Sequence, residues 1–195
     1  KPLTISGHEN AQISFIGTTC DNSMLLVTKG GTLTGLTIND GNCNNPSRDL
    51  IEVNSDADFR IENNSLMFGK RGVFIRPNTA NVTVAYNLIS NHDSYAVYRE
   101  TSSNSGQVNI FANNLLDNRS GYQVQVDCNN QGTANHNYWG ENKLAATNAT
   151  NCIVNNGKRL GAPILLAANT AGVQAQSLTV TSQFSYAFDG KIGAK

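Results

Sequence analysis

The sequence has little charge and no excess of either sign. Its 195 residues include 14 Lys plus Arg and 14 Asp plus Glu, so the formal net charge at pH 7 is zero. Charged residues make up 14% of the chain, against about 25% in an average soluble domain. A chain without a basic excess lacks the broad positive footprint with which proteins bind DNA, RNA or an anionic membrane surface. We therefore expect no nucleic-acid partner.

Long hydrophobic runs and paired cysteine motifs are also missing. No apolar stretch approaches the ~18 residues that a membrane-spanning helix requires, so we expect no membrane span. The chain has four cysteines and no Cys-x-x-Cys pair, which argues against zinc-ribbon and thioredoxin motifs. An even number of cysteines fits an oxidising compartment, and the opening Lys1-Pro2-Leu3 is what a processed mature form or an excised domain would show. We expect an extracellular, cell-surface or periplasmic location.

Neutral polar residues supply the polarity that charge does not. The chain contains 28 Asn and 17 Gly, and both residue types favour turns. Hydrophobic residues, at 39%, suffice for a core, and a length of 195 residues suits a single domain. The composition therefore predicts a neutral, turn-rich β protein.

A repeated phrase organises the middle of the chain. It consists of an apolar residue, any residue, a second apolar residue, any two residues, a small or amide residue, any residue and a third apolar residue. Its copies begin at Ile13, Leu36, Phe59, Val82, Val108 and Ala134. The first three steps between these starts are equal, and the last two are equal to each other and slightly longer, a register that chance alternation would not hold. Each unit has a second alternating segment, such as Val73 and Ile75, and such short period-two alternation predicts strands.

Units of this kind predict a parallel solenoid. One unit cannot bury its apolar side chains alone, but coils stacked at about 4.8 Å form a continuous core. About six coils then contribute equivalent positions to the same faces, and Asn64, Asn87 and Asn113 should stack as an amide ladder at a turn. We assign residues 1–156 to the solenoid and residues 157–195 to a C-terminal cap or extension.

Two pairs of cysteines are separated by about one coil. Cys20 and Cys43 occupy the same position in the first two copies of the phrase. Neighbouring coils lie about 4.8 Å apart, within the Cα separation of roughly 4.4–6.8 Å that a disulfide tolerates. The register therefore predicts a Cys20–Cys43 disulfide, and Cys128 with Cys152, also about one coil apart, is the natural second pair. Buried free thiols are the alternative.

Three phrases carry a family resemblance, namely Leu33-Thr34-Gly35-Leu36-Thr37-Ile38-Asn39-Asp40-Gly41, the asparagine ladder, and Asn137-Tyr138-Trp139-Gly140. They resemble the right-handed parallel β-helix of the pectate-lyase-like superfamily, particularly its short-repeat bacterial surface and periplasmic members, over roughly residues 3 to 155. The resemblance implies an all-β, right-handed parallel β-helix. It implies little about activity, because one scaffold carries many functions.

The catalytic motifs of that superfamily are missing from the sequence. Its hydrolases have an Asn-Thr-Asp segment, a paired aspartate and Gly-His-Gly, and its alginate epimerases have Asp-Pro-His; the chain contains none of these. The carboxyl-rich calcium clusters of its lyases are also missing. His136 is expected at an inward core position, and Trp139 in the core or a cap. We expect no cofactor, no metal and no catalytic residue, although the sequence leaves enzymatic activity open.

One group of residues has the character of a binding site. Arg76 and Arg99 lie one repeat apart at the same offset from the start of their copies, so both should point outward from stacked strands. Two such cations repel unless anions accompany them, and arginines beside aromatic rings suit a uronic-acid or sulfated sugar. The predicted ligand-binding residues are Arg76, Arg99, Glu100, Tyr98, His92 and Asp93. A surface ion-pair ladder that only supports the sheet is the alternative.

Two functional hypotheses follow from these observations. The first is a non-catalytic extracellular β-helix module for adhesion, matrix or self-assembly. Its partners would include other copies of the chain, bound through the solenoid ends or through residues 161–195, which contain the apolar run Ile164-Leu165-Leu166. The second hypothesis is a polysaccharide lyase, a hydrolase or a carbohydrate-binding domain that acts on acidic glycans.

Overall fold

The computed structural model describes the β-rich part of the chain. The described residues are 3–7, 11–14, 23–41, 48–100, 106–118, 124–125, 132–139, 153–154, 187–188 and 191–192. They form strands and turns and contain no helix, so this part of the chain has no helix that is long and apolar enough to cross a membrane. All four cysteines lie outside the described residues, and both disulfides therefore stay predictions.

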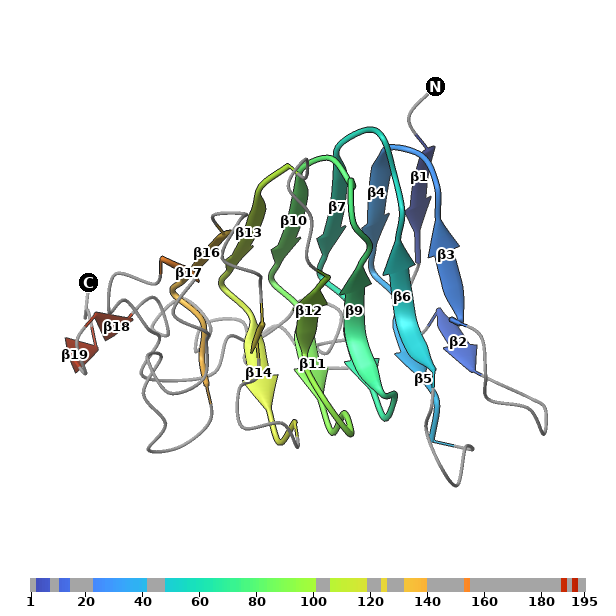
Figure 1. Cartoon of the computed structure of the whole chain (residues 1–195). Helices are drawn as coiled ribbons and strands as arrows, with labels where there is room; N and C mark the ends of the chain where they lie inside the picture. The colour runs from blue at the N-terminus through green and yellow to red at the C-terminus, as the bar shows by residue number, and fades with distance from the viewer. Residues whose placement is uncertain are drawn as a thin grey trace.

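Three parallel sheets build the solenoid (Figure 1). Sheet A contains, in spatial order, β1 (Leu3–Ser6), β4 (Gly31–Thr34), β7 (Phe59–Glu62), β10 (Val82–Ala85), β13 (Val108–Phe111), β16 (Gly132–Asn135) and β17 (Ile153–Val154). Sheet B contains β14 (Asn114–Leu116), β11 (Leu88–Ser90), β8 (Ser65–Met67), β5 (Thr37–Asn39) and β2 (Gln12–Ser14). Sheet C contains β15 (Val124–Gln125), β12 (Val97–Arg99), β9 (Arg71–Ile75), β6 (Asp49–Val53) and β3 (Leu25–Val27).

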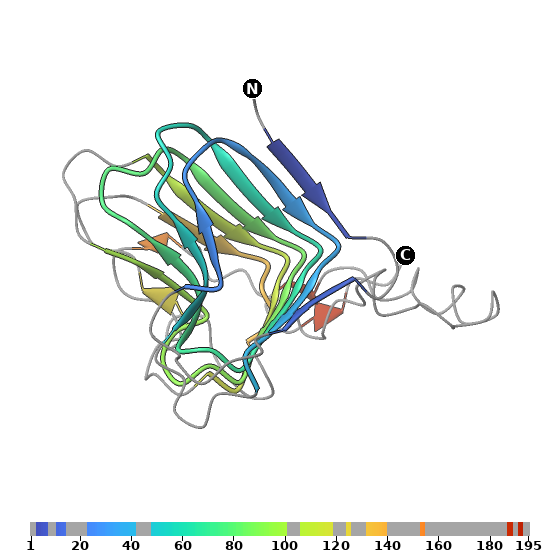
Figure 2. The same ribbon diagram turned by 90° about the vertical axis from the view of Figure 1, so that its right-hand side faces the viewer.

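The chain visits sheets A, B and C in turn and then returns to sheet A, which confirms the predicted all-β parallel solenoid (Figure 2). About four turns are formed, against the six that the repeat predicted. Among the described residues, β16 and β17 extend sheet A without companion strands in the other two sheets.

Apolar side chains fill the space between the sheets, as period-two strands require. Every second residue of each strand points inward, and equivalent inward residues of successive coils lie side by side. One buried row of sheet A consists of Leu33, Ile61, Val84, Ile110 and Ala134. Burial of one such aliphatic side chain contributes roughly 1.5–3 kcal/mol, so the stacked rows hold the coils together. Trp139 also joins the core, as the sequence predicted.

The coil register agrees with the repeat in the middle of the chain and differs from it at both ends. Val82 pairs with Phe59 and with Val108, as the repeat predicted. The partner of Phe59 in the preceding coil is Gly31 rather than Leu36, and the partner of Val108 in the following coil is Gly132 rather than Ala134. Both strands begin with glycine, so neither has an apolar first residue for a sequence pattern to detect.

The register of the first coil bears on the Cys20–Cys43 prediction. Ile13 pairs with Ile38 and not with Leu36. Cys20 follows Ile13 by seven positions, whereas Cys43 follows Ile38 by five. In the observed register the two cysteines therefore differ by two positions, and they do not share the equivalent position that suggested the pair. The disulfide itself stays a prediction.

Beyond β17, the described part of the chain contains one antiparallel pair, β18 (Ala187–Phe188) with β19 (Lys191–Ile192). This pairing differs from the parallel pairing of the solenoid. The division between residues 1–156 and 157–195, and the role of the second part as a cap, stay predictions.

Candidate functional site

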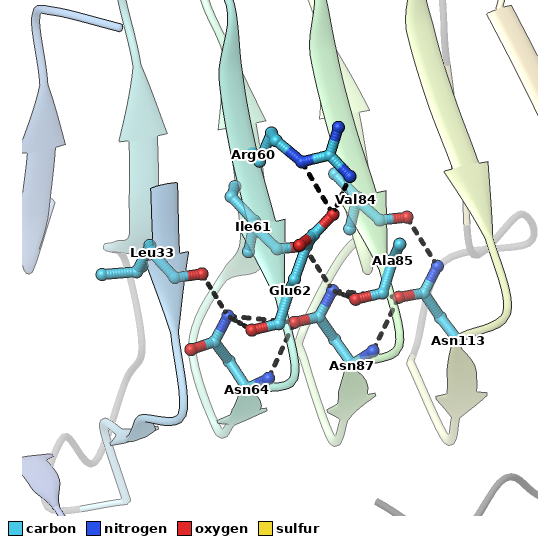
Figure 3. A network of polar contacts seen from close by, with 9 residues as sticks. All are labelled: Leu33, Arg60, Ile61, Glu62, Asn64, Val84, Ala85, Asn87 and Asn113. Carbon is cyan, nitrogen blue, oxygen red and sulfur yellow. Dashed lines mark hydrogen bonds and ion pairs between the residues drawn. The ribbon is translucent and has the colours of Figure 1, made fainter. Parts of the chain in front are cut away.

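The corner between sheets A and B holds a ladder of buried asparagines (Figure 3). The side-chain amide of Asn64 donates to Oδ1 of Asn87 at 3.1 Å, that of Asn87 to Asn113 at 3.0 Å, and that of Asn113 to Asn137 at 2.9 Å. Each Oδ1 of the last three also accepts the backbone N–H of the preceding ladder residue. Leu36 takes the equivalent position in the second coil, where its N–H donates to Asn64.

A residue with positive φ precedes each ladder asparagine. Asn63, Tyr86, Ala112 and His136 have φ between 55° and 58°, a region that residues other than glycine seldom adopt. The ladder hydrogen bonds hold this sharp corner in place. His136 is the half-buried corner residue of its coil, and the buried ladder position beside it, which the sequence had given to His136, belongs to Asn137.

A second ladder occupies the corner between sheets B and C, and it contains His92. The backbone N–H of Gly69 donates to Nδ1 of His92, and the backbone N–H of His92 donates to Oδ1 of Asn118, both at 3.1 Å. Nε2 of His92 lies 3.1 Å from the Leu66 carbonyl, so the Nε2–H tautomer satisfies both ring nitrogens. Complete burial lowers the pKa of His92 to about 4.

His92 is therefore a corner residue and is not available to a ligand. This corrects its assignment to the ligand-binding set. Asp93, the next residue, is half-buried, and its N–H donates to the Gly69 carbonyl at 3.0 Å. The sequence signal for this ladder was the shared spacing of His92 and Asn118, each two positions after the end of its sheet B strand.

Arg76 and Arg99 are not equivalent in the structure. Val97 pairs with Val73, and Arg99 pairs with Ile75, so Arg99 lies one residue out of step with Arg76. Between register-equivalent positions, the step from Ser90 to Val97 is one residue longer than the step from Met67 to Val73. Because side chains alternate along a strand, a shift of one residue moves a side chain to the opposite face. The predicted outward pair of arginines is therefore wrong.

Arg99 points into the solenoid, where 1% of its surface is exposed. Its guanidinium donates to the carbonyls of Gly106 and Thr79, the latter at 3.1 Å. Nε of Arg99 has no hydrogen-bond partner among the described residues. Burial lowers the pKa of Arg99 to about 10. Arg99 thus clamps two backbone segments that connect sheet C to sheet A.

The outer face of sheet C carries three aromatic rings, which we call the aromatic shelf: Phe74, Tyr95 and Tyr98. Phe74 and Tyr98 are register neighbours on β9 and β12, with ring centroids 5.8 Å apart and planes inclined by 36°. Tyr95 and Tyr98 lie 5.2 Å apart with planes inclined by 30°. Both tyrosines are half-buried, whereas Phe74 is buried.

Two arginines cover Phe74. Arg71 donates to both oxygens of Asp49, at 2.6 and 2.8 Å, and its guanidinium carbon lies 3.8 Å from the Phe74 centroid and 4.9 Å from that of Tyr98. The guanidinium carbon of Arg76 lies 4.5 Å from the Phe74 centroid. Stacked guanidinium groups and aromatic rings attract each other, so the two arginines help to hold the ring of Phe74 in place.

Arg76 connects two carboxylates. Its Nε donates to Oε1 of Glu52 at 2.6 Å, while Oε2 of Glu52 accepts the hydroxyl of Ser23. Burial opposes ionisation of Glu52, but the hydrogen bonds from Arg76 and Ser23 outweigh it and hold the pKa of Glu52 below its ordinary value. The hydrogen bond with Glu52 also raises the pKa of Arg76.

Glu100, rather than Arg99, is the neighbour of Arg76 on the outer face. The N–H of Glu100 donates to the Ile75 carbonyl at 3.0 Å, which places Glu100 beside Arg76. The closest Arg76 nitrogen and Glu100 oxygen are 3.7 Å apart, and 42% of each side chain is exposed. This separation is too long for a hydrogen bond, so the pair keeps donors and acceptors free for a third group.

We call Arg71, Arg76, Asp49, Glu52, Glu100 and the aromatic shelf together the sheet C surface. Of the six predicted ligand-binding residues, this surface contains Arg76, Tyr98 and Glu100. Among the residues that the structure describes, no group of three or more His, Cys, Asp or Glu side chains is placed to hold a metal ion. No protein-family model, curated protein or solved structure matches the chain.

Proposed function

We propose that the chain is a non-catalytic extracellular module of the adhesive or matrix type, and that it binds a glycan through the sheet C surface. The observation that carries the proposal is that the half-buried Tyr95–Tyr98 pair and the half-exposed Arg76–Glu100 pair are linked through Phe74, whose ring lies against both Tyr98 and Arg76. Aromatic rings provide an apolar face with a polar tip, and the ion pair provides hydrogen-bond donors and acceptors. A sugar ring offers the matching apolar face and hydroxyl groups.

The state of the carboxylates supports a binding role over a catalytic one. A general acid of a glycoside hydrolase needs a carboxyl group with a raised pKa. On the sheet C surface, Arg71 binds both oxygens of Asp49, and the pKa of Glu52 is lowered. Both carboxylates are occupied by arginine, and Glu52 is shifted away from the protonated form that a general acid needs.

The membership of the pectate-lyase-like superfamily and the right-handed winding belong to the same proposal. Three parallel sheets and an asparagine ladder at one corner support them. An extracellular, cell-surface or periplasmic location agrees with the neutral, Asn-rich composition.

Affinity electrophoresis through gels that contain single polysaccharides tests this proposal. We expect the wild-type protein to be retarded by at least one polymer, and the double variant Tyr95→Ala/Tyr98→Ala to lose the retardation with little change in melting temperature. Tyr86→Ala is the matched control, because Tyr86 is also half-buried and packs on another ring, that of Phe111, at 5.6 Å, away from sheet C.

Two results would contradict the proposal. If the double variant is still retarded, the protein binds the polysaccharide through a surface other than that of sheet C. Release of new reducing or unsaturated sugar ends from the retarding polymer would show that the protein is an enzyme.

Self-association through the N-terminal end of the solenoid is a second candidate function. A cavity of ≈ 200 Å³ opens there, lined by side chains that include Ile5, Leu25, Leu33 and Phe59. Ile5 is the last member of an inward row and is 43% exposed. Among the described strands, β1, β2 and β3 each pair on one side only, and such edges accept further strands. We propose a second copy of the chain as the occupant.

Sedimentation velocity over a range of protein concentrations tests the second candidate. We expect the wild-type protein to associate and Ile5→Lys to be monomeric, because a charge in the cavity would be desolvated by the partner. Thr4→Lys, an exposed position on the same strand, is the control and should associate. A wild-type protein that stays monomeric would rule out this candidate.

A further inference from the structure

The net charge of the sheet C surface disfavours an anionic ligand. Two guanidinium groups, Arg71 and Arg76, face three carboxylates, Asp49, Glu52 and Glu100. Arg71 is committed to Asp49 through two hydrogen bonds, and Arg76 is committed to Glu52 through one. The sum is one negative charge, so the surface attracts no polyanion.

A ligand carboxylate would also meet a specific obstacle. The N–H donors on Nη1 of Arg76 face Glu100, whose Oε2 lies 3.7 Å from that nitrogen. An anion that reached these donors would lie close to the carboxylate of Glu100. Like charges at such distances repel, and half-exposed groups are screened only in part.

Neutral hydroxyl groups fit the same place without that repulsion. A hydroxyl can accept a hydrogen bond from a guanidinium and can donate one to a carboxylate. Two adjacent hydroxyls of a sugar ring can therefore bind Arg76 and Glu100 together, and charge-assisted hydrogen bonds of this kind are stronger than neutral ones. The apolar face of the same ring can then pack on the half-buried Tyr98 and Tyr95.

We infer that the sheet C surface binds a neutral sugar ring through two adjacent hydroxyl groups, and that it discriminates against the corresponding uronate. This inference rests on the proposed function, because it names the ligand class of the same site. It replaces the acidic polysaccharide that the sequence predicted, because the second basic residue of that prediction is buried and a carboxylate takes its place beside Arg76.

The test compares polymers that differ in charge alone. A β-glucan, an α-glucan, a galactan and a mannan are each used as the neutral polymer and after oxidation of the C6 hydroxyls to carboxylates. We expect the wild-type protein to bind at least one neutral polymer at least tenfold more tightly than its oxidised form. We also expect the affinity for the neutral polymer to change less than twofold between low and high salt.

The variant Glu100→Gln isolates the source of the discrimination. It removes the negative charge and keeps a hydrogen-bond acceptor, so the preference for the neutral polymer should fall several-fold through stronger binding of the oxidised form. Glu62→Gln is the matched control, because Glu62 also pairs with an arginine, Arg60, but on the outer face of sheet A. This control should leave the preference unchanged.

The possible results separate the two proposals. If only the oxidised polymers bind, the neutral-ligand inference fails and the proposed glycan-binding function stands. If no member of any pair binds, both fail. If the neutral polymers bind but Glu100→Gln leaves the preference unchanged, the role given to Glu100 is wrong and the inference fails.

Discussion

The interior and the outer face of sheet C use the same residue types for different purposes. Arg99 inside and Arg76 outside lie one residue apart in register. Arg99 donates its hydrogen bonds to backbone carbonyls, whereas Arg76 is shared between carboxylates and an aromatic ring and stays 42% exposed. Polar groups that are buried fix the path of the chain, because each unpaired group costs about 1–3 kcal/mol. Polar groups on the surface contribute less to stability and remain available for binding.

The largest effect should come from breaking the asparagine ladder. Asn87→Ala removes the acceptor for the N–H and the side-chain amide of Asn64 and the donor to the carbonyls of Ile61 and Ala85. With several buried groups unpaired, we expect a loss of about 3–5 kcal/mol in the free energy of unfolding. Urea denaturation measures this loss. Asn109→Ala, at a half-buried position on the outer face of sheet A, is the control; equal losses in the two variants would contradict a special role for the ladder.

Acid should weaken the interior through His92. In the unfolded chain His92 binds a proton below its ordinary pKa of 6.5, but in the folded protein only below about 4. The unfolded state therefore binds more protons between these values, so stability is complete above pH 6.5 and falls as the pH drops towards 4. The expected loss is about 3 kcal/mol, measured by urea denaturation at a series of pH values. His92→Gln should flatten this part of the pH profile, and a wild-type profile that is already flat would refute the assignment.

Replacement of Arg99 should show that its shape matters more than its charge. Arg99→Met fills the same space without charge and leaves two carbonyls unpaired, for an expected loss of about 1–3 kcal/mol. Arg99→Lys keeps a buried charge but has no planar fork to reach both carbonyls, so it should be the less stable variant. Thermal unfolding compares the two. If Arg99→Lys is as stable as the wild type, the two hydrogen bonds of Arg99 to backbone carbonyls do not hold these segments together.

The smallest effect should come from the outer face. Arg76→Met removes a half-exposed ion pair, and exposed pairs contribute about 0–1 kcal/mol. We expect a loss below about 1 kcal/mol in urea denaturation, together with loss of glycan binding. A loss as large as that of Arg99→Met would show that the sheet C surface is mainly a structural ladder, which is the alternative that the sequence left open.

The sequence predicted the class of fold because stacked coils repeat the same pattern of apolar residues. Phe59, Val82 and Val108 have the predicted register. The pattern failed where glycine begins a strand, at Gly31 and Gly132, because the missing side chain removes the only signal that a sequence pattern detects.

The candidate site was predicted in part for the same reason. Tyr98, Arg76 and Glu100 do lie on one face. Arg99 was misplaced because one extra residue between β11 and β12 reverses its side chain, and the total length of a repeat does not reveal which corner contains the extra residue. Asp49 and Arg71 were missed because their ion pair joins different coils and no local motif marks it.

The asparagine corner has a consequence for how the solenoid tolerates insertions. After the first coil, the chain advances by five positions from the inward residue of sheet A to that of sheet B, as from Leu33 to Ile38, Ile61 to Leu66, and Val84 to Ile89. In the first coil, which has no ladder residue among those described, the equivalent step from Ile5 to Ile13 is longer. The other two corners vary in length from coil to coil, as the extra residue before β12 shows. The corner that holds the ladder thus keeps a constant length from the second coil onward, while the other two corners vary in length without disturbing the stack. New loops can therefore be grafted at the corners that flank sheet C, and the ligand specificity of that face can change while the scaffold stays the same.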